Sequence, residues 1–570
     1  MAEKPWLRHY DKGVPHSLKP YPAKTLIDFL RESSKSYPDG PALLFKGASF
    51  SYGELERMSN EFASALVSSG IRKGDRVALL LPNSPQMIIA EFGIWKAGAI
   101  AVPINPIYTD YELVHAFNAS GVETAIVLTS FYNKVNGLKG RTPLKRIIAS
   151  NIKEYLPPLI RVLFTLFKEK KEGHKITLAS GDVMFQSMIA ANAGSAGPAV
   201  SVTPDDPAIF LFSGGTTGKP KCAVGRHHAM VMSGMQLSKW FGVVSDDRLD
   251  IIMLNMPLFH VYAQVGIMTA GLVRSSPLAL VPNPRDIGDL LQTIKKLRPA
   301  VFAGVPTLFN ALAVHPMLLK DPTMLKSIKL IVSGASALHM DTKKRFEELT
   351  GGQIIEAYGL TESMVAAVLT PALGPRKDGS VGIPAPDVEI RIINHLGQGE
   401  DLPAGHVGEV LMHAPQLMDC YWGNPAETAD MIRDGWLYTG DLGYLDEDGF
   451  LFIVDRMKDI IKPGGFQVWP REVEEVIAKH PAVLEIGVAG VPDDYQVEAV
   501  KAWVVLREGF ELAADELKAH CRKELTAYKV PKHVEFRTAL PKSLVGKVLR
   551  RVLVEEHKAG LGEEDKNGTK

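Results

Sequence analysis

The chain contains 570 residues, which is too many for one ordinary hydrophobic core, so at least two domains are expected. Hydrophobic residues make up 46% and charged residues 22%, as in an ordinary globular protein. Lysine and arginine together number 64, and so do aspartate and glutamate. This balance disfavours a nucleic-acid-binding protein, which needs net positive charge.

Targeting and membrane-spanning segments are not expected. The N-terminal residues include charges and prolines where a signal peptide needs an apolar stretch. No run of about 18 apolar residues occurs. Cys222, Cys420 and Cys521 are far apart and lack metal-ligand or disulfide spacing, which fits a reducing compartment. We therefore expect a cytoplasmic location.

Most of the chain alternates helical patterns with short apolar strands. Residues 76–82 and 99–106 are expected to be strands on either side of a helix at 85–98, and similar patterns return at 289–306 and 328–335. Strand, helix and strand at short spacing indicate parallel α/β units. The predicted fold class of this part is α/β.

An apolar segment that ends in lysines occupies residues 155–171 and reads YLPPLIRVLFTLFKEKK. This pattern favours an amphipathic helix. The simpler interpretation is a helix packed on the protein's own body. The alternative is a helix that lies on a membrane surface, so peripheral membrane contact is a secondary hypothesis.

The pattern changes near residue 455. Two helical patterns, 470–480 and 514–525, alternate there with three strands, so we expect a compact α+β unit of about 110 residues. The final residues are polar and contain glycine, which predicts a tail without structure. The predicted boundaries are 1–455 for the N-terminal domain, 456–458 for a hinge, 459–556 for the C-terminal domain and 557–570 for a disordered tail.

Residues 211–222 read LFSGGTTGKPKC, an apolar strand followed by glycines, threonines and lysines. A Walker phosphate loop is excluded, because Ser213 and Pro220 stand where that motif needs glycine and serine or threonine. Glycines, hydroxyl donors and lysines nevertheless suit a bound polyanion; the alternative is a plain surface turn. The residues of this candidate phosphate site are Ser213, Gly214, Gly215, Thr216, Thr217, Gly218, Lys219 and Lys221.

A second motif, IIEAYGLTESM, covers residues 354–364. Tyr358 suits stacking on a base, Thr361 suits a phosphate contact, and the Glu362 carboxylate suits a hard cation. The alternative is a helix N-terminus that Thr361 caps.

A third motif begins with YTGD. Asp441 is expected in a tight turn, where its carboxylate suits two vicinal hydroxyls such as those of ribose; the alternative is ordinary turn chemistry. Residues 446–449 predict a hairpin turn. Arg456 and Lys458 lie at the domain boundary, where they are either solvated linker residues or a nucleotide contact and a pivot.

Two further residues are candidates for chemistry. Lys547 follows Gly546 before an apolar helical pattern, and it is either the start of a basic helix or a loop residue that reaches another domain. His260 lies in an apolar stretch, where a buried structural histidine is the default interpretation.

Five of these motifs, taken in order, resemble signatures of the adenylate-forming superfamily, which includes acyl-CoA synthetases, adenylation domains and luciferases. The resemblance extends from about Leu26 to Leu553. The motifs GGTTG, PLFHVY and GGFQVWPREVEEVI look most like the medium- and long-chain fatty acyl-CoA ligase branch. The five superfamily motifs are SGGTTGKPK, YGLTE, YTGD, DRMKD and PKSLVGK.

The resemblance implies a large N-terminal domain of parallel α/β sheets with a small β-barrel-like subdomain, followed by a small mobile α+β domain. It also implies a ligase that converts a carboxylic acid, ATP and coenzyme A into a thioester through an acyl-adenylate, with Mg²⁺ as cofactor. The expected partner is a small carboxylic acid, a homodimer is a further expectation, and no nucleic acid is expected.

The resemblance assigns a role to each candidate. Residues 213–221 would hold the β- and γ-phosphates, Thr216 and Glu362 the magnesium ion, and Thr361 the α-phosphate. Asp441 and Arg456 would bind the ribose, and His260 would line the acyl pocket. The residues expected around the adenine are Gly334, Ala335, Ser336, Glu356, Ala357, Tyr358 and Gly359.

The small domain is expected to rotate between the two half-reactions. Lys547 would bridge the carboxylate and the α-phosphate during adenylation. Lys458 would then act as the hinge, and Gly464 and Gly465 would face the pantetheine tunnel, where glycines permit close passage of a thin chain.

Two positions depart from the superfamily pattern. Gly214 stands where many members have serine, which we interpret as specific to the fatty acyl branch, and Cys222 replaces a usual glycine without an explanation. The alternatives to a fatty acyl-CoA ligase are a ligase for an aromatic or alicyclic acid, an adenylation module that feeds a carrier protein, and a catalytically silent acyl- or nucleotide-binding protein.

Overall fold

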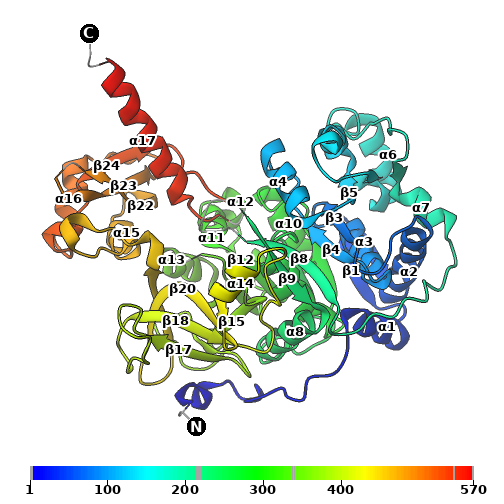
Figure 1. Ribbon diagram of the computed structural model, residues 1–570, viewed down its shortest axis with the longest axis horizontal. Helices are drawn as coiled ribbons and strands as arrows, with labels where there is room; N and C mark the ends of the chain where they lie inside the picture. Colours follow the sequence, from blue (N-terminus) through cyan, green and yellow to red (C-terminus); the bar gives the residue numbers. More distant parts are fainter. Residues whose placement is uncertain are drawn as a thin grey trace.

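A computed structural model of the chain describes residues 4–213, 220–336, 338, 340–493, 495–543 and 546–567. Figure 1 shows a large body built from the first three quarters of the chain and a small domain, coloured orange to red, at one side of it. The candidate phosphate residues Gly214 to Lys219 lie outside the described residues.

A seven-stranded sheet forms the first layer of the large body, in the order β7-β6-β5-β3-β4-β8-β9. Its pairs are parallel except for β8 and β9, which form an antiparallel hairpin. The strands are β3 (Arg76–Leu80), β4 (Ile100–Pro103), β5 (Thr124–Leu128), β6 (Arg146–Ser150), β7 (Val183–Met184), β8 (Pro207–Ser213) and β9 (Lys221–Arg226).

A nine-stranded sheet forms the second layer, in the order β16-β15-β14-β13-β12-β10-β11-β1-β2. Its central pairs are parallel, and β2, β15 and β16 are antiparallel additions at the edges. The strands are β1 (Pro41–Phe45), β2 (Ala48–Ser51), β10 (Ile252–Leu254), β11 (Leu278–Leu280), β12 (Val301–Gly304), β13 (Leu330–Ser333), β14 (Ile354–Leu360), β15 (Val365–Leu369) and β16 (Ile383–Pro384).

Helix α3 (Pro85–Lys96) belongs to a continuous hydrophobic core that includes strands of both sheets. All twelve of its residues are buried, including three polar ones; of these, Lys96 pairs with Glu56 at 2.7 Å, as a buried charge requires. The predicted strand, helix and strand at 76–106 are confirmed as β3, α3 and β4.

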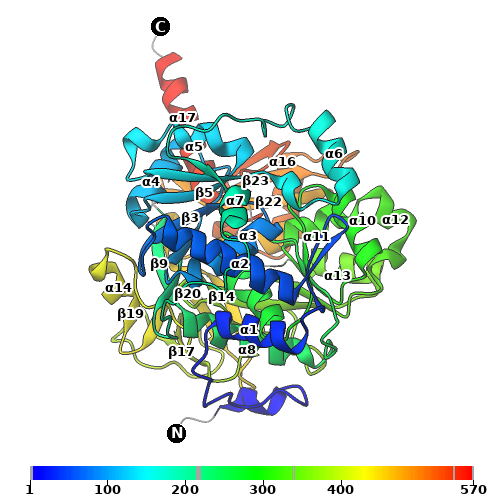
Figure 2. The same ribbon diagram turned by 90° about the vertical axis from the view of Figure 1, so that its right-hand side faces the viewer.

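The other helices of the large body surround these sheets (Figures 1 and 2). Several begin at a capping box; for example, Ser51 accepts from the Glu54 backbone amide at 3.2 Å while Glu54 accepts from the Ser51 amide at 2.8 Å. The helices are α1 (Leu26–Ser36), α2 (Tyr52–Ser68), α4 (Asp110–Ser120), α5 (Tyr132–Asn136), α6 (Pro158–Phe167), α7 (Phe185–Ala191), α8 (His227–Gly242), α9 (Met268–Leu272), α10 (Ile287–Leu297), α11 (Pro306–Ala313), α12 (Pro316–Lys320), α13 (Met340–Thr350) and α14 (Pro425–Met431).

A five-stranded antiparallel sheet, ordered β17-β18-β20-β19 with β21 beside β20, occupies the place of the small β subdomain. The predicted hairpin at 446–449 is confirmed, since it joins β20 to β21. The strands are β17 (Glu389–Ile393), β18 (Gly408–His413), β19 (Ile432–Arg433), β20 (Trp436–Leu445) and β21 (Leu451–Arg456).

The small domain has hydrophobic clusters of its own around a three-stranded sheet, β22-β23-β24. This is the α+β unit predicted beyond residue 455. Its elements are β22 (Val483–Asp493), β23 (Val497–Leu506), β24 (His533–Arg537), α15 (Pro470–Ala478), α16 (Ala514–Cys521) and α17 (Arg550–Asn567).

Two expectations about helices are wrong. Helix α17 continues to Asn567, so residues 557–567 are helical and not a disordered tail, because the Ala, Leu, Glu and Lys residues there favour helix. Residues 158–167 do form helix α6, but its apolar residues do not pack on the protein's own body: only Phe164 is buried. Among the described residues, none of the helices combines the length and apolar character needed to cross a bilayer.

Candidate active site

Asp441 is the centre of a buried polar cluster at the edge of the large domain. The residue is 4% exposed, and its carboxylate accepts a hydrogen bond from the Tyr358 hydroxyl at 2.7 Å and pairs with Arg456 Nε at 2.9 Å. Strands β14, β20 and β21 supply the three residues. The structure thus brings together the residue predicted for a base and the two predicted for ribose hydroxyls.

Asp441 does not lie in a tight turn, as the sequence suggested, but within strand β20. The register between β18 and β20 shifts there, so that Thr439, Gly440 and Asp441 all lie opposite Val410. Thr439 donates to the Val410 carbonyl at 2.7 Å, and Gly440 has φ of +69°. A bulge of this kind turns a side chain away from the regular ladder, and here it directs Asp441 to Tyr358.

The protonation of this cluster follows from burial. Burial and the Asp441 carboxylate raise the pKa of Tyr358 well above its usual value, so the phenol remains a hydrogen-bond donor. The Asp441 charge raises the pKa of Arg456 despite opposing burial. The cluster therefore presents one carboxylate between two fixed donors.

The stem of the glycine-rich loop approaches Glu362. Ser213 and Lys221 are paired at the ends of β8 and β9. The Lys221 ammonium lies 5.1 Å from the centroid of the Tyr421 ring, and the Tyr421 hydroxyl donates to Glu362 at 2.5 Å. Glu362 is 6% exposed, so its carboxylate is fixed beside the stem.

Thr361 and Glu362 lie in the turn between β14 and β15, so the alternative of a helix N-terminus at Thr361 is wrong. A chain that reverses into an antiparallel partner strand has no room for a helix there.

The residues around Glu362 fit magnesium held mainly by substrate. Within the described ranges, no group of three or more His, Cys, Asp or Glu side chains could hold a metal ion. Magnesium commonly binds one or two carboxylates together with substrate phosphates, and a single fixed carboxylate beside a phosphate-type loop matches that pattern. Thr216, the other predicted ligand, lies outside the described residues.

The predicted adenine residues lie on adjacent strand ends. Gly334, Ala335 and Ser336 follow β13, and Glu356, Ala357 and Gly359 belong to the neighbouring β14. A side chain at Gly334 would begin 3.2 Å from the Tyr262 ring, so glycine permits this close approach. Glu356 is buried beside Lys343 at 3.5 Å, and burial raises its pKa.

Lys547 reaches this region from the small domain. Lys547 is exposed as a residue, but the surrounding protein partly desolvates its ammonium. This desolvation is the larger cause, and the charge of Arg456 the smaller one, that lowers the pKa of Lys547 to about 8. Burial, and then the Lys547 charge, lower the pKa of His260 to about 4, so the histidine is neutral at pH 7. The ammonium therefore lies close enough to influence both His260 and the Arg456–Asp441 pair.

Gly546 sets the approach of Lys547 to the large domain. It has φ of +73°, and a side chain at this position would begin 2.1 Å from Thr307 Oγ1 of helix α11. Both the backbone conformation and the contact therefore require glycine.

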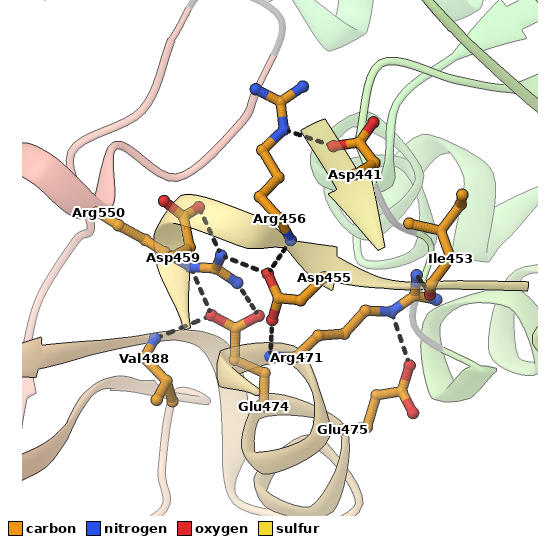
Figure 3. Close-up of polar contacts among 10 residues, drawn as sticks. All are labelled: Asp441, Ile453, Asp455, Arg456, Asp459, Arg471, Glu474, Glu475, Val488 and Arg550. Atoms are coloured by element: carbon orange, nitrogen blue, oxygen red, sulfur yellow. Dashed lines mark hydrogen bonds and ion pairs between the residues drawn. The ribbon is translucent and has the colours of Figure 1, made fainter. Parts of the chain in front are cut away.

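A second charged cluster joins the two domains beside the hinge (Figure 3). Arg550 contacts Asp455 at 3.3 Å, Asp459 at 3.2 Å and Glu474 at 2.8 Å. The Arg471 amide donates to Asp455 at 2.8 Å. The side chain of the next residue, Arg456, points in the opposite direction, toward Asp441. Asp455 therefore belongs to the Arg550 cluster, and Arg456 belongs to the Asp441 cluster.

The other predicted hinge and tunnel residues lie in the small domain or at its entrance. Lys458 belongs to the short helix Met457–Asp459 directly after β21, and it is exposed. Gly464 has φ of +55°, lies with Gly465 in the short helix Pro463–Gly465, and donates its amide to the Gln496 carbonyl at 3.0 Å.

Gln496 also lines a cavity of about 560 Å³ in the small domain. Its wall carries three basic residues, Lys518, Arg522 and Lys532, and the ring of Tyr528. Tyr528 stacks on the exposed ring of Phe466, with centroids 4.6 Å apart. A basic and aromatic cavity therefore adjoins the glycine turn.

Sequence reasoning missed several residues of the site. Tyr421 lies outside the quoted motifs, and Tyr262 ends the PLFHVY motif, which indicates only the family branch. The hydrogen bonds of both tyrosines cross between elements: Tyr421 donates to Glu362, and Tyr262 donates to the Val332 carbonyl at 3.0 Å. Arg550 is a third such residue, because only the fold places it against Asp455 and Asp459 of the DRMKD motif and no local pattern indicates this contact.

Comparison with known proteins gives consistent matches over nearly the whole chain. The model of AMP-binding enzymes matches residues 30–422, and that of the AMP-binding enzyme C-terminal domain matches residues 472–547. A long-chain-fatty-acid–CoA ligase of Bacillus subtilis (strain 168) is 37% identical over 556 residues, which cover 97% of this chain and 98% of the relative. One of Yersinia pestis is 35% identical over 559 residues, with 97% and 98% covered.

Among solved structures, the anthranilate CoA ligase AuaEII in complex with anthranoyl-AMP has a TM-score of 0.81 at 26% identity, covering 94% of this chain and 97% of that one. The likeness includes the large and the small domain, as the resemblance implied. With both domains matched in order, and with relatives above 30% identity over almost their full length, the chain belongs to the family of AMP-binding enzymes.

Proposed function

We propose that the protein is an AMP-forming acyl-CoA ligase that activates an apolar carboxylic acid, most favourably a long-chain fatty acid. The observation that carries the proposal is the contact of the small domain with the large domain at Gly546: the loop that carries Lys547 meets Thr307 of helix α11, and the Lys547 charge lowers the pKa of His260 in the large domain. A binding protein without catalysis has no need of a movable cation at this position.

The first half-reaction joins two anions. A carboxylate oxygen of the acid attacks the α-phosphorus of ATP, and the bond from that phosphorus to the pyrophosphate oxygen breaks. Lys547 would hold the carboxylate and the α-phosphate together, while Thr361 would donate to the same phosphate. Fixed positive charge where negative charge concentrates lowers the barrier of such a step.

The nucleotide would lie along the ends of β13, β14 and β20. Asp441 and Arg456 would bind the ribose hydroxyls, and Tyr358 would pack on the base. The loop 213–221 would hold the outer phosphates. When bound, magnesium would be held by Glu362 and phosphate oxygens, where it neutralises the leaving pyrophosphate.

The second half-reaction would use the other face of the small domain. The thiolate of coenzyme A attacks the acyl carbonyl, and the bond to AMP breaks. Rotation about Lys458 would withdraw Lys547 and present Gly464 and Gly465. The adjoining cavity, with its three basic residues and Tyr528, suits the phosphates and the base of coenzyme A.

The acyl substrate is the finer part of the proposal. The names of the Bacillus and Yersinia relatives favour a long-chain fatty acid. The second candidate is an aromatic acid, because the anthranilate CoA ligase shares the fold over 94% of this chain. His260, neutral and close to Lys547, would line the acyl pocket beside the reacting carbonyl.

The test is a substrate panel from short to long fatty acids, with benzoate and cyclohexane carboxylate, supplied with ATP, magnesium and coenzyme A. We expect AMP, pyrophosphate and a thioester, with the highest kcat/KM for a medium- or long-chain acid. A preference for benzoate would favour the second candidate. No thioester with any acid would contradict the proposal, and ATP–pyrophosphate exchange without thioester would indicate an adenylation module.

A cytoplasmic location and a homodimer complete the proposal. Cell fractionation tests the location, and sedimentation velocity of the full chain tests the dimer.

A further inference from the structure

Helix α6 presents an apolar surface to solvent. Seven of its ten residues have large apolar side chains, and six of these seven are 42–71% exposed. Among the described residues, 23 large apolar side chains are exposed, so six of them fall in this one helix. The six residues, which we call the α6 face, are Leu159, Ile160, Val162, Leu163, Leu166 and Phe167.

The α6 face is continuous. Residues three and four apart lie above one another on a helix, so Leu159, Leu163 and Leu166 form one stripe, with Val162 and Phe167 on its two sides. The helix meets the protein through its other side, where Phe164 packs on His174 and Arg161 pairs with Glu154 at 2.8 Å. Nothing in the described part of the chain covers the face.

Positive charge surrounds the α6 face. Residues 153–175 contain six lysines and arginines against three glutamates. All three glutamates have a basic partner: Glu154 pairs with Arg161, Glu169 with Lys153 at 2.6 Å, and Glu172 with Lys168 at 3.6 Å on the exposed surface, so three positive charges remain in excess. Lys170 and Lys171 are exposed directly after the helix.

The other end of the helix also has a cation beside it. Pro157, directly before the helix, and the Lys296 ammonium are both neighbours of Gly47. A Cβ atom added to Gly47 would lie 3.7 Å from the Pro157 ring and 3.4 Å from the ammonium. Lys296 of α10 is exposed, so both ends of the α6 face are flanked by positive charge.

We propose that α6 docks the protein onto the surface of a bilayer that contains anionic phospholipids. The helix is too short to cross a bilayer, since ten residues span about 15 Å against about 30 Å of hydrocarbon. An apolar face with a basic rim is the composition of helices that lie in the interface. The α6 face would enter the acyl boundary, and Lys168, Lys170 and Lys171 would contact the phosphates.

A second copy of the chain fits this face less well. Pairing α6 with α6 about a twofold axis would bring two basic rims together, and like charges would oppose the contact. Anionic phosphates complement the same rim. The charge distribution therefore favours a lipid surface over a homodimer at this helix.

The position of α6 leaves the catalytic cycle unhindered. Figures 1 and 2 both show the helix at the outer margin of the large domain, and Figure 1 places it on the side away from the small domain. A docked protein could therefore still rotate its small domain. If the proposed substrate is correct, docking would also bring the enzyme to the layer in which apolar acids dissolve; this advantage rests on the proposed function, whereas docking itself does not.

The experiment measures binding of the full chain to vesicles by co-sedimentation. The vesicles contain either 30% phosphatidylglycerol in phosphatidylcholine or phosphatidylcholine alone, at low and high salt. We expect wild-type binding to the anionic vesicles that weakens with salt. The double substitution Leu163→Glu/Leu166→Glu should weaken it by about tenfold or more.

A matched control places the same charges on other exposed leucines. Leu319 and Leu396 are 55% and 75% exposed, so Leu319→Glu/Leu396→Glu should leave vesicle binding unchanged. A second variant, Lys168→Gln/Lys170→Gln/Lys171→Gln, keeps the apolar face and should lose up to about fivefold per lysine on anionic vesicles only. It gives an answer even if the double glutamate variant does not fold.

Thioester formation with a water-soluble acid in the absence of vesicles should be the same for all variants, because α6 is not part of the site. If the wild-type protein does not bind anionic vesicles, the proposal is wrong. It is also wrong if Leu163→Glu/Leu166→Glu binds them as well as the control Leu319→Glu/Leu396→Glu. A dimer in sedimentation velocity that only Leu163→Glu/Leu166→Glu dissociates, without vesicle binding by the wild type, would assign the face to a second copy instead.

Discussion

On the large-domain side of the candidate site, Asp441 is 4% exposed and is held by Tyr358 of β14 in the nine-stranded sheet and by Arg456 of β21 in the five-stranded sheet. On the small-domain side, Lys547 is exposed and sits in a loop that meets the large domain through Gly546 and Thr307. The large-domain residues of the site are thus fixed by β-sheets, whereas the position of Lys547 depends on the orientation of the small domain. Substitutions on the two sides should therefore differ in which half-reaction they impair.

The largest effect is expected from Lys547→Ala. Loss of one positioned cation should lower the adenylation rate by about 10²–10³-fold. The rate of thioester formation from a supplied acyl-adenylate should change by less than about threefold, because Lys547 is proposed to be withdrawn from the site in that step. Stopped-flow or quenched-flow assays of the separate half-reactions measure both.

Lys542→Ala is the control, since Lys542 precedes the same loop and pairs with Glu485. Equal losses in both half-reactions of Lys547→Ala would show that the cation is not specific to adenylation, and the comparison between the two sides would fail.

Asp441→Asn should come next, with kcat/KM for ATP lower by roughly 10–10²-fold, because a charged acceptor for two hydroxyls and for Arg456 becomes neutral. This loss should appear as weaker nucleotide binding in isothermal titration. Asp448→Asn, in the turn of the same β20–β21 hairpin, should leave the ATP affinity unchanged. An unaltered affinity of the Asp441 variant would exclude Asp441 from the nucleotide site.

Arg550→Gln tests the contact between the domains. The side chain joins Asp455 on the large-domain side to Glu474 on the other, so its loss should free the small domain and lower adenylation by about tenfold. Thioester formation should suffer less or improve. Arg551→Gln is the matched control, because Arg551 is the next residue and is 67% exposed. A larger loss in thioester formation would indicate that the cluster stabilises the second conformation.

The pH dependence should report Lys547 directly. Its pKa is lowered to about 8, so the ammonium is present below pH 8 and is lost as the pH rises. Adenylation kcat/KM should then fall by about tenfold per pH unit above 8. Lys547→Arg, which stays charged, should remove this alkaline decline even if its overall rate is lower. A decline that persists in the arginine variant would belong to another group.

The smallest effect is expected from Tyr358→Phe. The variant keeps the ring and removes the hydroxyl that donates to Asp441, so KM for ATP should rise by about threefold. Tyr444→Phe, on the same strand β20 but stacked on Phe452, should have no effect on this KM. An effect of Tyr358→Phe as large as that of Asp441→Asn would mean that the hydroxyl contacts substrate itself.

Local chain chemistry was enough for much of the fold. Short apolar strands around a helix at 76–106 predicted parallel α/β units, because connections of that length bring consecutive strands side by side. The same reasoning located the second unit beyond residue 455. The polar composition of residues 557–567 predicts a tail without structure, whereas helix α17 continues to Asn567.

Helices α3 and α6 show the limit of composition. Both sequences are strongly apolar, yet all of α3 is buried and α6 buries only Phe164. Burial depends on whether other layers cover a helix on each side, and this is a property of the topology. The sequence preference for packing α6 on the protein's own body was wrong for that reason.

The sequence by itself determined the order of elements, the two domains and the residue types that a nucleotide site needs, because motif spacing and apolar periodicity are local properties of the chain. Only the tertiary structure decided that a bulge turns Asp441 toward Tyr358, that Arg550 closes the contact between the domains, and that the loop carrying Lys547 meets the large domain at Thr307. These contacts join residues that are 80 or more positions apart or belong to separate domains, and their energies depend on burial and relative placement, which no local pattern encodes.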